Sequence, residues 1–185
     1  MSSQNKSIRF ITRAAMGIAL VILAQLIGNK VPQGAAIVGQ FKVNQLITGS
    51  LVNCVLFVFT AVGGTWCGVV IGILSALLAA VIRIGPKVPA ITPLIACGNA
   101  ILCLVFALVS GKLKAPGILG VIAAAVVKCG FLWLSVPLLL QALEIAEPQR
   151  TTLTVMFSWP QGCTALIGGL LAIIIIPRVL EAIKS

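Results

Sequence analysis

Residues 116–143 read PGILGVIAAAVVKCGFLWLSVPLLLQAL, an apolar run whose only charged residue is Lys128. A membrane-spanning helix needs about 20 mostly apolar residues, so this run is long enough to cross a bilayer. A charge that faces lipid at the bilayer centre costs at least about 2.5–3.5 kcal/mol, so Lys128 is expected to face the interior of the protein. The stretch therefore predicts a transmembrane helix with one cation turned into a helical bundle.

The rest of the chain has the same apolar character. Hydrophobic residues make up 60% of the sequence and charged residues 9%, and the mean hydropathy is +1.19. Soluble domains carry roughly 25% charged residues, so the chain is expected to be an integral membrane protein. The predicted spans are 8–28, 45–62, 65–84, 90–109, 116–142 and 151–177. We therefore predict one all-α domain over residues 1–185, a single bundle of six transmembrane helices.

The positive charge of the chain fits a membrane protein better than a nucleic-acid-binding one. The formal net charge is +10, but the lysines and arginines sit singly at the ends of apolar segments. Residues placed in this way act as topology signals and headgroup anchors. With both termini in the cytoplasm, the basic residues number seven on the cytoplasmic side and five on the outer side. We therefore expect cytoplasmic termini and no nucleic-acid partner.

Small residues recur at helical spacing in two spans. In the third span, glycine or alanine occupies every fourth position from Gly64 to Ala80, which lets a neighbouring helix approach closely. Packing within the bundle is the favoured interpretation, and contact between copies of the chain is the alternative. The first span carries Ala15-x-x-x-Ala19, which fits either internal packing or a docking surface for another subunit.

The predicted spans contain no carboxylate near their middles that could pair with Lys128. Gly120, Ala124 and Lys128 share one i, i+4 face, which turns the lysine toward the bundle. The chain has no Asp, and none of its three Glu residues lies near the middle of a span. Either a ligand provides the acceptor, or the amine bonds to backbone carbonyls and Asn side chains. The sequence leaves both interpretations open.

Several polar and aromatic residues from four spans are predicted to lie at a similar depth. At 1.5 Å per residue they fall roughly 10–15 Å below the outer surface, with Lys128 a little deeper. Pro160 frees a backbone carbonyl in the same region, because proline disrupts the helical hydrogen bonds. A concave polar site that faces outward is therefore expected. Its candidate substrate-binding residues are Asn53, Asn99, Lys128, Trp133, Ser158, Trp159 and Gln161.

Catalysis does not fit this set of residues. Without His or Asp, the chain lacks an imidazole base, a carboxylate pair within the membrane and a metal cluster of ordinary spacing. It also lacks a GxxxxGK[ST] phosphate loop, so it is not expected to hydrolyse ATP. We predict a protein that is not an enzyme and that needs neither a metal nor a cofactor.

The pattern of segments resembles the substrate-binding S components of energy-coupling factor (ECF) transporters, which take up vitamins in bacteria and archaea. The resemblance covers nearly the whole chain: its length, its six spans, its basic N-terminus and the character of each span. The segments that carry it are GSLVN (49–53), GVVIGILSALLA (68–79), PLIACGNAILCLVF (93–106), AAVVKCGFLWLSVPLLL (124–140) and FSWPQGCTALIGGLLA (157–172).

The resemblance implies a function and its partners. It implies a multi-pass protein of the prokaryotic cell membrane that captures a vitamin-like molecule, docks on a transmembrane T component with two ATPases, and reorients in the bilayer to deliver its cargo. Ala15 and Ala19 are similar to the family's docking face, and the connections at 29–44 and 84–90 resemble its gating loops. The alternatives are a homo-oligomeric pore or structural bundle, and a membrane enzyme that acts on a lipid. The identity of the vitamin is left open.

Overall fold

The computed structural model describes residues 3–31, 36–38, 41–84, 86 and 88–184 of the chain. Five helical segments are long and apolar enough to cross a membrane, and α3 is a shorter apolar helix. The helices are α1 (Ser3–Lys30), α2 (Val43–Gly63), α3 (Thr65–Val81), α4 (Thr92–Phe106), α5 (Gly117–Ala142), α6 (Gln149–Met156) and α7 (Trp159–Lys184). A 3-10 turn, η1 (Pro89–Ile91), precedes α4, and a π-helical turn, η2 (Ala107–Lys112), follows it.

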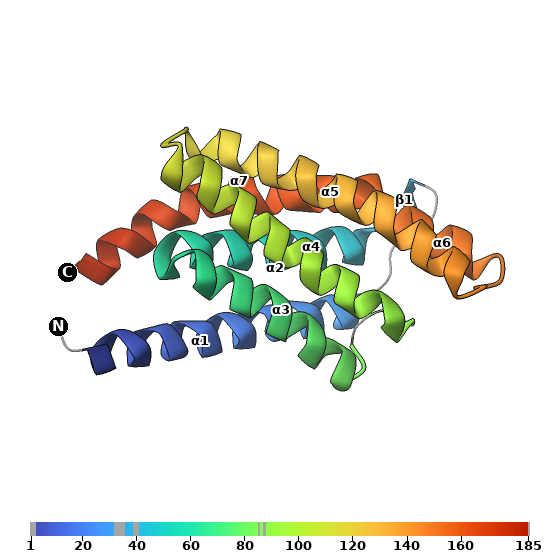
Figure 1. Cartoon of the computed structure of the whole chain (residues 1–185), viewed down its shortest axis with the longest axis horizontal. Helices are drawn as coiled ribbons and strands as arrows, with labels where there is room; N and C mark the ends of the chain where they lie inside the picture. Colours follow the sequence, from blue (N-terminus) through green and yellow to red (C-terminus); the bar gives the residue numbers. More distant parts are fainter. Residues whose placement is uncertain (1–2, 32–35, 39–40, 85, 87, 185) are drawn as a thin grey trace.

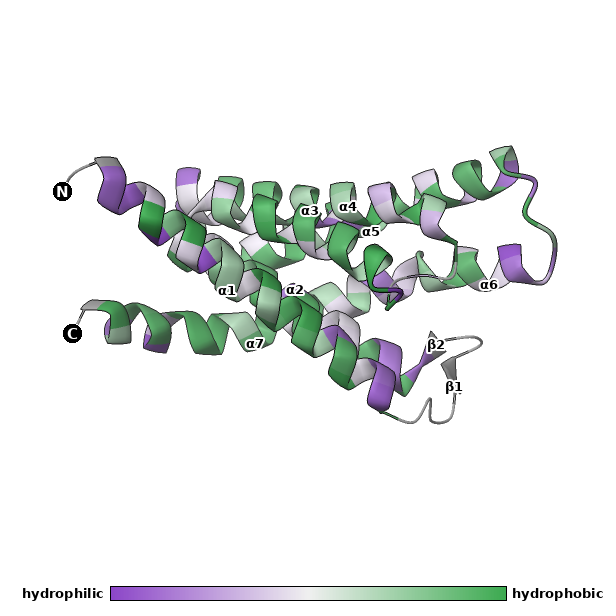
Figure 2. Cartoon of the chain, turned by 90° about the horizontal axis from the view of Figure 1, so that it is seen from below, coloured by the Kyte–Doolittle hydropathy of each residue, from purple (hydrophilic) through white to green (hydrophobic). Residues whose placement is uncertain are grey.

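The long helices form one elongated bundle with two distinct ends. Figure 1 shows both chain termini at one end, which we call the terminal end, and α6 at the other, which we call the distal end. Hydrophilic residues gather toward these ends, and hydrophobic residues predominate along the middles of the helices (Figure 2). This distribution matches a bilayer around the middle of the bundle, and the prediction of a helical membrane protein is confirmed.

Most of the predicted spans are confirmed, with shifted ends. The fifth span, predicted over 116–142, corresponds to α5, and the second corresponds to α2. The third was expected to reach residue 84, but α3 ends at Val81 and the chain turns through Arg83, whose φ is 58°. The fourth span consists of η1, α4 and η2 in succession.

The sixth predicted span, 151–177, lies within one apolar segment long enough to cross a membrane, Gln149–Ile183, but its helix is not continuous. The segment divides into α6 and α7, with a break at Phe157 and Ser158. Pro160 explains the break, because its ring nitrogen cannot donate to the carbonyl of Met156 four residues earlier and its ring clashes with that carbonyl. The Gln161 side chain takes the missing donor's place, and its Nε2 lies 3.1 Å from the Met156 carbonyl oxygen. The expected free carbonyl is therefore present and is satisfied locally.

The connection at 29–44, which is long enough to have structure of its own, contains a small antiparallel hairpin. Its strands are β1 (Ala36–Val38) and β2 (Phe41–Lys42), with Ala36 opposite Lys42. Part of this connection lies outside the described residues. The hairpin leads into α2 at the distal end, where the backbone N–H of Lys42 donates to Gln45 Oε1 at 3.2 Å.

Close helix packing uses the small residues that the sequence singled out. A Cβ built on Gly68 would collide with Thr60 of α2, and one built on Gly72 would lie 2.9 Å from the Cβ of Asn99 in α4. The prediction that this strip serves packing within the bundle is thus confirmed for Gly68 and Gly72, whereas Gly64 is exposed and a Cβ built on it would meet no atom within 4 Å. In the core, Phe57 and Phe106 meet edge to face, with ring centroids 4.9 Å apart.

Candidate functional site

The Lys128 side chain lies inside the bundle, as its position on α5 predicted. Only 3% of the residue is exposed. Its Nζ donates two hydrogen bonds, to Asn53 Oδ1 at 2.7 Å and to Asn99 Oδ1 at 2.8 Å. Three of the seven predicted site residues, from three different helices, therefore meet at one amine. Both bonds are short enough to be strong charge-assisted hydrogen bonds.

Each asparagine is fixed in turn by a second helix. Asn53 Nδ2 donates to Thr164 Oγ1 of α7 at 3.3 Å, and Asn99 Nδ2 donates to the Gly72 carbonyl of α3 at 3.2 Å. With its amide nitrogen bonded in this way, each side chain turns its oxygen toward Lys128. Five helices thus contribute to one polar network. We call it the Lys128 cluster: Lys128, Asn53, Asn99, Thr164 and the Gly72 carbonyl.

Glycines let the helices come close enough to build this cluster. A Cβ on Gly168 of α7 would lie 2.4 Å from the Ser50 carbonyl oxygen and 2.9 Å from the Cβ of Asn53. The backbones of α2 and α7 are therefore nearly in contact beside Asn53. Gly72 brings α3 equally close to Asn99. The cluster and the small-residue packing are parts of the same arrangement.

The cluster contains a cation without a carboxylate. Glu144 and Glu147 lie in the connection between α5 and α6, and Glu181 lies in the last turns of α7, so all three acidic residues are near the ends of the bundle. Lys128 instead meets the negative ends of two amide dipoles. An ammonium group has three donors, and its third N–H has no partner among the described residues. One position on the amine is available for a further acceptor.

The structure does not bring the other four candidate residues to this amine. Ser158 Oγ donates to the Val155 carbonyl at 2.8 Å, and Gln161 donates to the Met156 carbonyl, so both satisfy the break between α6 and α7. Trp159, next to the break, is 40% exposed, and Trp133 on the outside of α5 is 60% exposed. A similar predicted depth therefore does not bring these residues to the same side of the bundle as Lys128.

Thr164 belongs to the cluster but was not predicted from the sequence. It follows Gln161 by three residues, so it lies on nearly the same face of α7 and about one turn deeper. This spacing is a signal that sequence reasoning could have used. The structure adds the reason why the residue matters: its hydroxyl is the acceptor that orients Asn53.

Two buried hydroxyls lie between the cluster and the distal end. Ser50 precedes Asn53 by one turn of α2, and Thr92 precedes Asn99 by two turns of α4. Each residue is 4% exposed, and neither hydroxyl oxygen has a hydrogen-bond partner among the residues that the structure describes. A buried polar group without a partner is destabilising, so such groups are commonly satisfied by a bound water or a ligand.

The cluster itself is closely packed. Two cavities, of about 590 and 410 Å³, lie elsewhere and include none of its side chains. Neither of these two cavities corresponds to the expected concave, outward-facing site. Any ligand that reaches Lys128 requires the helices to separate at one end.

Ala15 and Ala19 lie on the exposed side of α1. The same helix turns Ala14 and Gly17 inward, and a Cβ on Gly17 would collide with the Ile71 side chain. The Ala-x-x-x-Ala pair therefore does not serve packing within the bundle, and it leaves a smooth strip on the outer surface.

Comparisons of this chain with protein-family models, with curated proteins and with solved structures find no match.

Proposed function

We propose that this chain is the substrate-capturing membrane subunit of a micronutrient importer, similar to the S component of an ECF transporter, and that the Lys128 cluster is its binding site. The observation that carries the proposal is the buried amine held between two amide oxygens. The substrate is a vitamin-like small molecule with a carboxylate or phosphate group.

The physical reason for proposing an anionic substrate is that Lys128 has no negatively charged side chain as a partner among the described residues. Charged side chains inside membrane proteins usually pair with an opposite charge or line a pathway. The spans provide Lys128 with neutral partners alone. An anionic ligand group would occupy the third donor position and form a charge-assisted bond in a medium of low dielectric, where such bonds are strong. The amide oxygens meanwhile keep the amine in place when the ligand is absent.

The buried hydroxyls support a binding path from the distal end. Ser50 and Thr92 lie on that side of the cluster, and their oxygens have no hydrogen-bond partner. A polar molecule bound there would satisfy both hydroxyls and reach Lys128 with its anionic group. Opening is most easily accommodated at the α6–α7 break, because the regular helical bonds are already interrupted at Phe157 and Ser158.

Delivery requires partner proteins in this account. The exposed strip at Ala15 and Ala19 suits close contact with a helix of a transmembrane T component. The two ATPases of such an importer would supply energy, and the bundle would reorient within the prokaryotic cell membrane. In this arrangement the termini face the cytoplasm and the distal end faces outward.

A homo-oligomeric pore or structural bundle is the second candidate, and the packing of α3 disfavours it. The small residues that would join copies of the chain instead contact Thr60 and Asn99 of the same chain. A lysine buried to 3% exposure is also unsuited to lining an open channel.

Co-purification tests the proposal. The protein, purified in mild detergent from cells grown on rich medium, is denatured, and the released small molecules are identified by mass spectrometry. We expect close to one equivalent of a single anionic or strongly polar compound, and co-expression with a T component and ATPases should yield a complex. Wild-type protein that releases no compound and captures no such partner would contradict the proposal.

A further inference from the structure

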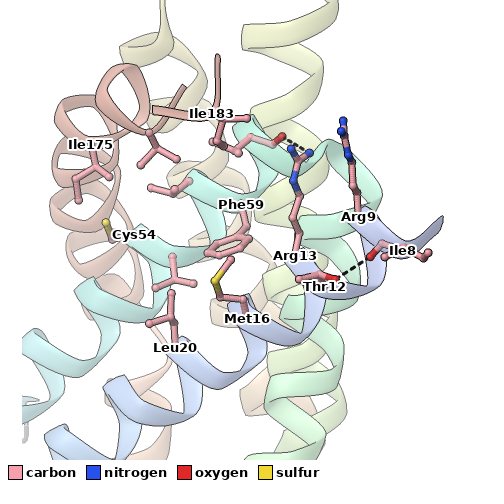
Figure 3. Close-up of a pocket in the computed structure, with 14 residues that line it drawn as sticks. Ile8, Arg9, Thr12, Arg13, Met16, Leu20, Cys54, Phe59, Ile175 and Ile183 are labelled. Atoms are coloured by element: carbon pink, nitrogen blue, oxygen red, sulfur yellow. Dashed lines mark hydrogen bonds between the residues drawn. The ribbon is translucent and has the colours of Figure 1, made fainter. Parts of the chain in front are cut away.

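A long apolar groove runs along the terminal half of the bundle, away from the Lys128 cluster. It has a volume of about 590 Å³ and is bounded by α1 from Ile8 to Leu20, by α2 from Cys54 to Val62, and by α7 from Ile175 to Ile183. Figure 3 shows Arg9 and Arg13 toward the N-terminal end of α1, and Met16 and Leu20 farther along the same helix. The groove therefore has a basic mouth and an apolar body.

The length of the groove matches one leaflet of a bilayer. Arg9 and Leu20 are separated by 11 residues of α1, which span about 16 Å at 1.5 Å per residue. Half of a hydrocarbon core is about 15 Å thick. A groove of this length, open to the side and bounded by three helices, suits an acyl chain whose headgroup lies at the level of the arginines.

The charges at the mouth favour an anionic headgroup. Arg13 donates to the Val62 carbonyl at 3.0 Å, which holds its guanidinium beside the end of α2 and leaves further N–H donors on the same group. None of the described residues that line the groove is acidic, and the one acidic residue of α7, Glu181, lies between the lining residues Val179 and Ile183 but is not part of the lining. Guanidinium groups match phosphate geometry well, and basic pockets between helices at a membrane surface are typical phospholipid sites.

We propose that this groove binds an anionic phospholipid, with the phosphate at Arg9 and Arg13 and one acyl chain between α1, α2 and α7. The lipid completes the surface between α1 and α7, which lie apart at the ends that carry the chain termini (Figure 2), and Ile8, Met16 and Leu20 of α1 are 54%, 53% and 41% exposed. This site is independent of substrate capture, because it shares no residue with the Lys128 cluster.

Lipid titration of the detergent-purified full-length chain tests the proposal. The probes are dioleoyl phosphatidylglycerol and dioleoyl phosphatidylcholine, which share acyl chains and differ in headgroup charge, and native mass spectrometry counts the bound lipids. We expect one phosphatidylglycerol to bind preferentially. Arg9→Gln should weaken that binding about tenfold, the loss of one charge-assisted hydrogen bond. Arg9 is exposed and its replacement leaves the Arg13 bond to α2 intact, so folding should be retained.

Two further variants separate a specific site from diffuse attraction. Arg178→Gln removes an exposed positive charge from the same end of the bundle but outside the groove, and it should leave binding unchanged. Val179→Trp fills the groove from α7 and should reduce phosphatidylglycerol binding although both arginines remain. Equal binding of the two lipids by the wild type, equal losses in Arg9→Gln and Arg178→Gln, or unchanged binding in Val179→Trp would each overturn the proposal.

Discussion

Lys128 is held by amide oxygens, and neutral partners of this kind leave its ammonium group able to bind an anionic ligand. A carboxylate partner would neutralise the ammonium group permanently and compete with any anionic ligand. The oxygens of Asn53 and Asn99 orient the amine but leave its charge uncompensated. The Lys128 amine can therefore bind and release an acceptor group of a ligand, whereas a lysine in a buried ion pair would keep its carboxylate partner.

The cluster predicts a graded response to mutation. Asn99→Leu removes an acceptor from Lys128 and a donor from the Gly72 carbonyl, so it should lower the free energy of unfolding by about 1–3 kcal/mol. Thr164→Val removes the acceptor of Asn53 Nδ2 and the bond from the Thr164 hydroxyl to the Gln161 carbonyl, but no bond to the charged amine, so it should cost less, about 0.5–1.5 kcal/mol. Denaturant or thermal unfolding in detergent measures both. Equal stability of Asn99→Leu and the wild type would show that the network is not formed in solution.

Sequence reasoning predicted three residues that meet in the Lys128 cluster, and it grouped with them four residues that lie elsewhere. Lys128 was predictable because a lone cation on the face of Gly120 and Ala124 has nowhere else to point. Asn53 and Asn99 were predictable from depth. Ser158 and Gln161 share that depth, but their polar groups bond to carbonyls at the α6–α7 break. Counting residues along a helix gives height in the membrane, and it does not give the rotation that decides which side chains meet.

At the scale of single helices, hydropathy located the spans but could not locate the interruption in the last one. The break follows from Pro160 and from the Gln161 side chain that caps the Met156 carbonyl, which are local hydrogen-bonding effects. Hydropathy also could not locate the end of α3, because the turn at Arg83 depends on backbone conformation.

The contact between α2 and α7 gives a prediction with a matched control. Gly168→Ala would place a Cβ 2.4 Å from the Ser50 carbonyl oxygen, a backbone atom that cannot rotate away, so it should destabilise the fold by about 1–3 kcal/mol. Gly130→Ala in α5 meets no atom within 4 Å and should be neutral or stabilising by up to about 1 kcal/mol. Melting temperatures in one detergent compare the two. Equal effects would contradict the close approach of α2 and α7.

Glu147, two residues before the start of α6, has a carboxylate whose pKa depends on its local hydrogen bonds. The Thr151 hydroxyl and backbone N–H both donate to Glu147 Oε2, at 2.5 and 3.2 Å, and the hydroxyl bond is the main reason that the pKa of Glu147 lies below its ordinary value. A lowered pKa stabilises the fold above the ordinary glutamate value of about 4.3, and this stabilisation is lost as the pH falls through the lowered value.

Thr151→Val should therefore raise the pKa of Glu147 toward its ordinary value. NMR titration of the labelled side chain in detergent measures the change. Thr152→Val is the control, because the Thr152 hydroxyl donates to the Pro148 carbonyl and not to Glu147. An unchanged pKa in Thr151→Val would show that the hydrogen bond is absent in solution.

At the scale of the whole molecule, we assign separate functions to the two ends of the bundle. The distal end leads from the α6–α7 break past Ser50 and Thr92 to Lys128. The terminal end carries both termini and the basic groove, and the α1 strip at Ala15 and Ala19 lies between the ends on the outer surface. Hydropathy could predict the bundle, because the bilayer dictates helix length and polarity. It could not predict which partner each surface meets.

Docking on a partner can be tested apart from substrate binding. Ala19→Trp places a large side chain on the exposed strip, so it should abolish uptake by the assembled importer while leaving ligand binding by the isolated chain nearly intact. Leu134→Trp, at a residue of α5 that is 73% exposed, is the control and should transport normally. Unimpaired transport by a well-expressed Ala19→Trp variant would exclude this face as the docking surface.

Whether Lys128 binds the substrate is tested by the affinity of Lys128→Met for the compound released from the wild-type protein, with the melting temperature measured on the same sample. Methionine has similar length but no charge, so the variant should fold and lose roughly 2–5 kcal/mol of binding free energy, because the ligand's anionic group is left without its partner. Lys112→Met, a change at an exposed lysine at the terminal end, should bind as the wild type does. Wild-type affinity in a folded Lys128→Met protein would contradict the account and assign Lys128 a purely structural role.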